Sequence, residues 1–125
     1  MFPNANELQK KQNLGRLKTT KTLGDTDGDG DHDIIYAYGG RSFSIWKEDG
    51  TLVFDSGNAF ENIISKRSPD MFNANGPSKI DDRSDDKGPE PEALAIGKID
   101  GRTYAFIGME RNNAIFAYDI TLPSD

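Results

Sequence analysis

Five aspartates alternate with other residues early in the chain and are followed directly by an apolar run. They are Asp25, Asp27, Asp29, Asp31 and Asp33. Like charges this close repel, by about 1 kcal/mol per pair at about 4 Å even in water. Calcium takes about six to eight oxygen ligands from carboxylates, backbone carbonyls and water, which a flexible loop can deliver. The pattern therefore predicts a calcium site, and the alternative is a solvated acidic turn without an ion.

The order of these aspartates distinguishes between two kinds of calcium loop. An EF-hand needs a bidentate Glu at its twelfth position, and Tyr36 stands there instead. The remaining pattern, D-x-D-x-D-G-x-x-D, resembles the short calcium loops of integrin-type propeller repeats, in which the last Asp opens a strand. We expect the calcium ion to be bound by the carboxylates of four aspartates: Asp25, Asp27, Asp29 and Asp33. A backbone carbonyl near Asp31, whose own carboxylate is the least direct candidate, and water complete the shell. His32, the only histidine, is a spacer in this pattern.

Composition limits the size and the class of the protein. The chain has 125 residues, 34% of them hydrophobic, with 13 glycines and no cysteine, so it can bury one modest core and has no disulfide or thiol chemistry. The five aspartates and the segment 81–92, which has six acids and two bases, carry a net charge of −9, so the rest of the chain is at +3. The acidity is thus local, as metal sites would make it. The sequence has no cluster of basic residues of the kind that binds nucleic acid. It also has no apolar run long enough to span a membrane.

Short β-patterned segments between turn residues predict an all-β protein made of two antiparallel meanders. A shift of 70 residues lays Ile34–Ala37 on Tyr104–Ile107 and Asp49 on Asp119. Repeated meanders are typical of propeller blades, and two blades cannot close a ring of about four to eight. The expected strands cover residues 14–23, 33–38, 42–47 and 51–55 in the first meander, and 92–99, 102–110 and 113–120 in the second. We therefore predict a fragment of a β-propeller with a lead-in at 1–13, a first blade with the calcium loop at 14–57, a helix and acidic loop at 58–91, and a second, incomplete blade at 92–125.

One helix is expected, at residues 58–67. Asn58 is a typical N-cap, Glu61 follows three residues later, and Pro69 ends the helix. Residues 68–91 then show no strand pattern, and a loop of that length in a compact domain is usually functional or disordered. Within it, Glu90 precedes Pro91, which disfavours the α region for the backbone at Glu90 and keeps the segment extended.

Three long stretches carry a family resemblance: GDTDGDGDHDIIYAYGGRSFSIW, DDRSDDKGPEPEALAIG and GRTYAFIGMERNNAIFAYDIT. They resemble the choice-of-anchor I family, which comprises bacterial secreted or surface propeller proteins, often described as alkaline phosphatase-like. The family has relatives among mesenchyme-specific cell-surface glycoproteins of biomineralising animals. The resemblance covers residues 14–121 and implies a calcium-dependent β-propeller that is secreted or at the cell surface. The remaining blades of a longer parent protein would be its first partners.

A second resemblance, to β-propeller phytases, concerns the acidic ends of two neighbouring strands. An antiparallel pair joined at Asp100–Gly101 places the start of one strand beside the end of the next, and so places Glu92 beside Glu110 with Arg111 nearby. Two carboxylates and an arginine suit a calcium and phosphate site. The alternative is an ion pair of Glu110 with Arg111 at a strand end. The residues proposed for this second calcium site are Asp85, Asp86, Glu92 and Glu110, and the catalytic candidates are Glu92, Glu110 and Arg111.

Two functions remain open at this point. The chain is a calcium-binding structural or binding module of a secreted or cell-surface, alkaline phosphatase-like protein, or it is part of a calcium-dependent phosphoesterase. The first would present loops to a partner or a mineral surface, and the second would act on a phosphate ester. Exposed blade edges also favour pairing with a second copy of the chain.

Overall fold

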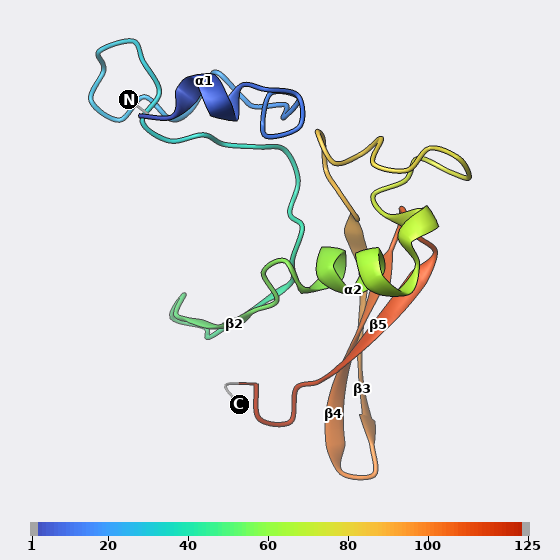
Figure 1. Cartoon of the computed structure of the whole chain (residues 1–125). Helices are drawn as coiled ribbons and strands as arrows, with labels where there is room; N and C mark the ends of the chain where they lie inside the picture. The colour runs from blue at the N-terminus through green and yellow to red at the C-terminus, as the bar shows by residue number, and fades with distance from the viewer. Residues whose placement is uncertain (1–2, 124–125) are drawn as a thin grey trace.

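The structure, a computed structural model, describes residues 3–123 (Figure 1). Its regular structure is mainly strand, arranged as a two-stranded and a three-stranded antiparallel sheet with little helix. The all-β prediction is confirmed at that level. No closed barrel or propeller forms among residues 3–123. None of the helices in this range is long and apolar enough to cross a membrane.

The three-stranded sheet matches the second meander closely. It consists of β3 (Pro91–Ile99), β4 (Arg102–Met109) and β5 (Ala114–Asp119), in the order β3-β4-β5. Asp100 and Gly101 join the first pair with φ values of 50° and 78°, as a two-residue hairpin turn with both central residues at positive φ requires. The register pairs Pro91 with Met109 and Ala93 with Gly108. Glu92 is therefore the extra residue of a β-bulge at the start of β3.

The two-stranded sheet and the helix follow one another in the middle of the chain. The hairpin pairs β1 (Ser44–Trp46) with β2 (Leu52–Asp55), and α2 (Ala59–Arg67) with the 3-10 turn η1 (Pro69–Met71) comes next. The predicted helix is thus confirmed within one residue. Asn58 occupies the N-cap position, but its side chain makes no cap hydrogen bond. Residues 72–90 contain no strand, as the sequence predicted.

The core lies where α2 packs on one face of the three-stranded sheet (Figure 1). Phe60 and Ile64, one turn apart on the helix, meet alternate residues of β4, because side chains of a strand alternate between its two faces. Aromatic rings extend this core; Phe43, for example, packs edge-on against Tyr118 with ring centroids 4.7 Å apart. The buried residues are Phe60, Ile64, Ala105, Ile107 and Met109.

The first meander is smaller than the sequence predicted. Strands at 14–23 and 33–38 do not form, and the only pairing between these segments is an isolated bridge from Thr19 to Ala37. Most apolar residues of the pattern stay exposed; the exposed fraction of Leu23 is 60% and that of Ile35 is 45%. A strand pattern becomes a strand only when its apolar face has something to pack on, and here the described chain offers no such surface. N-terminal to these two segments, α1 (Ala5–Leu8) forms a single helical turn.

Candidate cation sites

The acidic loop is closed at its neck by backbone hydrogen bonds. The carbonyl oxygen of Gly24 accepts from the amides of Asp33 and Ile34, at 2.8 and 3.1 Å. Gly24 has a φ of +112°, and a Cβ there would lie 2.2 Å from the carbonyl oxygen of Ile34. Only glycine fits this position without strain or displacement. The sequence thus brings the two ends of the loop together and leaves its aspartates at the tip.

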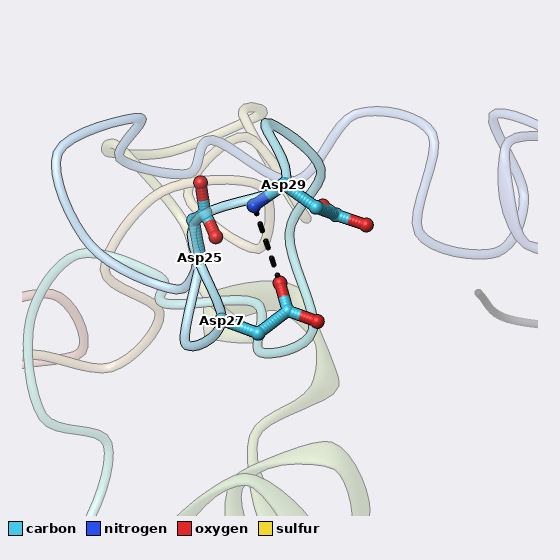
Figure 2. Close-up of side chains that lie close together, drawn as sticks. All are labelled: Asp25, Asp27 and Asp29. Carbon is cyan, nitrogen blue, oxygen red and sulfur yellow. Dashed lines mark hydrogen bonds between the residues drawn. The ribbon is translucent and has the colours of Figure 1, made fainter.

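Three of the five aspartates converge. Carboxylate oxygens of Asp25, Asp27 and Asp29 lie within 4.8 Å of one another, and all three residues are exposed. Figure 2 shows the three side chains on the same turn of chain, with the amide of Asp29 donating to Asp27 Oδ1 at 3.3 Å. The amides of Gly28 and Gly30 donate to the two carboxylate oxygens of Asp25, at 2.6 and 3.1 Å. These backbone donors orient the carboxylates before any ion arrives.

The other two aspartates have different positions. Asp33 Oδ2 accepts from the hydroxyl and the amide of Thr26, which hold the pKa of the Asp33 carboxyl below its usual range. These two hydrogen bonds connect the end of the loop, at Asp33, to its beginning, at Thr26. Asp31 donates its amide to Asp29 Oδ1 at 2.9 Å, and its carboxylate is outside the converging group. The structure therefore places Asp33 as a clasp beside Thr26 and leaves Asp31 at the periphery.

The loop has little local charge compensation. None of the ion pairs formed within residues 3–123 involves an aspartate of the loop. Hard oxygen donors on a short glycine-containing loop are the ligands that calcium prefers. The donor set fits that ion, and a bound ion would offset repulsion among the three converging carboxylates.

A second group of acids lies at one end of the three-stranded sheet. Oxygen atoms of Glu90, Glu92 and Glu110 approach within 4.8 Å of one another. Glu92 and Glu110 are thus brought together, and Arg111 Nη2 lies 2.8 Å from Glu110 Oε1. A hydrogen bond with the Glu92 carboxyl raises the pKa of Glu110, because a carboxyl must keep its proton in order to donate such a bond. The alternative interpretation, an ion pair of Glu110 with Arg111, also holds.

Asp85 and Asp86 are not part of this group. Asp86 Oδ2 lies 3.2 Å from Arg83 Nη1 and 3.2 Å from Lys18 Nζ, so it serves ion pairs elsewhere. The carbonyl of Asp85 accepts from the amide of Lys18 at 2.7 Å, which joins the N-terminal segment to the acidic loop of residues 68–91.

Glu90 is the member that sequence reasoning missed. The Pro-rich sequence predicts an extended backbone at Glu90, whereas its φ is +52° and the residue is almost fully buried. Burial tends to raise the pKa of its carboxyl, but hydrogen bonds and charge from Arg83 and Arg111 outweigh this and lower it. The sequence signal for this role is Arg83, which lies close to Glu90 along the chain, because a buried glutamate needs a cationic partner.

Comparisons with known proteins place the chain in a family. It matches the choice-of-anchor I domain over residues 1–123. The chain belongs to the choice-of-anchor I domain family.

Two relatives are similar to the chain over much of its length. Gigasin-3a of Magallana gigas is 36% identical over 118 residues, covering 89% of this chain and 41% of the relative. The mesenchyme-specific cell surface glycoprotein of Strongylocentrotus purpuratus is 33% identical over 101 residues, covering 69% of this chain and 13% of the relative. The chain therefore spans less than half of either relative. No solved structure matches it.

Proposed function

We propose that this chain is a calcium-binding module of a secreted or cell-surface protein. The observation that carries the proposal is the convergence of Asp25, Asp27 and Asp29 on an exposed loop without a basic partner among the described residues. Membership of the choice-of-anchor I family and the similarity to the Strongylocentrotus purpuratus protein, which is named a cell surface glycoprotein, support the location. Free calcium outside cells is high enough to fill loops of modest affinity.

The role of calcium in this proposal is structural. The loop connects two segments, 14–23 and 34–43, that carry many exposed apolar residues and only one isolated bridge. A bound ion would fix the loop from which both segments leave, and so restrict their conformations. The ordered surface would then be available to a partner protein or a mineral surface.

The faces of the three-stranded sheet support a place inside a larger β-assembly. The face opposite α2 carries Tyr104, Phe106 and Ile115, with the small residues Ala95 and Ala117 beside them. The exposed fraction of Ile115 is 75%. A sheet that is apolar on both faces is typical of strands covered on both sides. We infer that further sheets of a longer parent, the remaining blades of a propeller, cover this second face, and a second copy of the chain is the alternative cover.

Calcium titration calorimetry tests the proposal. The wild-type chain should bind calcium at the loop, and the triple variant Asp25→Asn/Asp27→Asn/Asp29→Asn should lose that binding. Asp70→Asn, which alters an exposed aspartate in η1, is the matched control and should bind as the wild type does. At a hundredfold excess of calcium over its Kd, stability should rise by about 2.7 kcal/mol in the wild type. Equal binding by the wild type and the triple variant would refute the loop as a calcium site.

A second candidate function is a calcium-dependent phosphoesterase formed by the longer parent protein. The observation that favours it is the group of Glu92, Glu110 and Arg111 at the end of the sheet. A calcium ion bound there would polarise a phosphoryl oxygen, and the arginine could bind a second oxygen. Hydrolysis of a phosphate ester by the parent should then fall at least a hundredfold in Glu92→Gln and Glu110→Gln. Unchanged turnover in both variants would remove this site.

A further inference from the structure

The three glutamates at the end of the β3-β4-β5 sheet are positioned by backbone structure. The carbonyl of Glu90 accepts from the amide of Glu110 at 3.0 Å, so Glu90 is tied to the end of β4. The bulge between Pro91 and Ala93 makes Glu92 the unpaired extra residue of β3. Bulges redirect side chains in this way at the ends of sheets. The three carboxylates therefore approach one another because of a specific irregularity in the strand.

The Glu90 carboxylate is buried, and only one of its two oxygen atoms accepts hydrogen bonds. Its side chain has an exposed fraction of 1%. Oε1 accepts from Arg83 Nη2 and Nε, at 2.5 and 3.1 Å, and lies 3.1 Å from Arg111 Nε. Oε2 has no hydrogen-bond partner within the described residues, and Lys87 Nζ lies 3.8 Å from it. A buried carboxylate oxygen without a donor is costly, so Oε2 is an available ligand for an ion.

The side chains around this oxygen form a network of charges. Four carboxylates, those of the three glutamates and of Asp86, lie in it together with four cationic side chains, Lys18, Arg83, Lys87 and Arg111. Among the residues that the structure describes, no ion pair involves Glu92. The arginines bind Oε1 of Glu90 and one oxygen of Glu110, which leaves the other oxygens of the group for a cation.

We propose that Glu90, Glu92 and Glu110 form a second cation site, separate from the aspartate loop, that binds a divalent ion preferring oxygen ligands, of which calcium is the representative. Glu90 supplies the fixed, buried ligand, and the exposed Glu92 and Glu110 close over the ion from the two strands. Arg83 and Arg111 are positioning residues, because they hold Glu90 and Glu110 in place. The site requires neither calcium binding at the loop nor any catalytic activity.

Calcium titration in a background without the loop site tests this proposal. In the Asp25→Asn/Asp27→Asn/Asp29→Asn variant we expect one equivalent of calcium to remain bound. Adding Glu92→Gln and Glu110→Gln should weaken that binding at least tenfold, whereas Glu48→Gln, an exposed glutamate in the β1-β2 turn, should not change it. Absence of calcium binding in the triple variant, or binding that survives both glutamine substitutions, would overturn the site.

The number of calcium ions bound per wild-type chain gives a second test of the site, which does not depend on the folding of the triple variant. We expect two equivalents of calcium in the wild type and one in Glu92→Gln/Glu110→Gln. One equivalent in both proteins would overturn the cation site while leaving the loop site intact.

Discussion

The two halves of the molecule are stabilised in different ways. From α2 onward, helix and sheet enclose a core in which Phe60 and Ile64 meet Ala105 and Ile107, all at 2% exposure or less. Before β1, the chain runs as an open path apart from the sheet (Figure 1), and none of the apolar side chains of residues 3–43 is buried. The first half is held by polar contacts, such as Arg16 to Asp81 and the amide of Lys18 to the carbonyl of Asp85.

The difference shows what each half needs in order to be ordered. Burial of apolar area offsets the conformational entropy of the second half. The first half buries too little for that and is held by polar contacts instead. If the proposed function is right, a cation bound at its acidic loop would therefore have the greatest effect on order.

The largest effect is expected in the core of the second half. Phe60→Ala removes a fully buried ring that packs on Phe116 and Tyr118, and should lower the free energy of unfolding by about 3 to 5 kcal/mol. Ile115→Ala, at a residue with 75% exposure, should change it by less than about 0.5 kcal/mol. Chemical denaturation followed by circular dichroism measures both, and equal losses would contradict the assigned core.

A smaller effect is expected at the neck of the loop. Gly24→Ala should cost about 1 to 3 kcal/mol of loop closure, because its Cβ would collide with the Ile34 carbonyl oxygen, and this should appear as weaker calcium binding. Gly28→Ala has a similar positive φ of 80° but open space around the new Cβ, so it isolates the collision. Equal calcium affinities for the two variants would mean that the neck does not control the site.

The link between the halves should contribute less again. Arg41 Nη1 lies 2.9 Å from Glu61 Oε1 on α2, and Arg41 Nη2 donates to the carbonyl of Ser84 at 2.6 Å. Arg41→Met should cost about 1 to 2 kcal/mol, because Glu61 then keeps only the amide of Asn73. Urea unfolding measures the loss. An unchanged midpoint would show that this bridge adds nothing to stability.

The smallest expected effect is a dependence of stability on pH, which comes from Asp55 at the end of β2. The hydroxyl of Ser44 and the amide of Gly57 hold the pKa of the Asp55 carboxyl below its ordinary value. A lowered folded pKa stabilises the protein above the unfolded pKa, about 3.9, and that contribution disappears as the pH falls through the folded pKa. Asp55→Asn should therefore lose less stability than the wild type between about pH 4 and pH 3. Asp70→Asn should follow the wild type, and a wild-type slope in Asp55→Asn would contradict the assignment.

Sequence reasoning located the second half well and the first half poorly. The strands of β3, β4 and β5 and the helix α2 follow from alternating apolar residues, the Asp100–Gly101 turn and the Pro69 stop, all of which are local signals. The pattern at 33–38 was just as regular, yet it stays outside both sheets because no partner strand or covering layer meets it. Local pattern cannot supply that information.

The candidate sites divide in the same way. The convergence of Asp25, Asp27 and Asp29 depends on spacing within one loop, and spacing can be read from the sequence. The role of Glu90 depends on a positive φ, a bulge and two arginines from other segments. Such a combination emerges only when the sheet is formed.

Hydrogen exchange with and without calcium tests the central claim most directly, namely that an ion at the aspartate loop orders the first half of the chain. We predict that calcium slows exchange of the amides of Gly28, Gly30 and Asp33, each of which donates within the loop. Amides of β4 should exchange equally slowly in both conditions, because the core already protects them. Identical exchange of the loop amides with and without saturating calcium would contradict the claim.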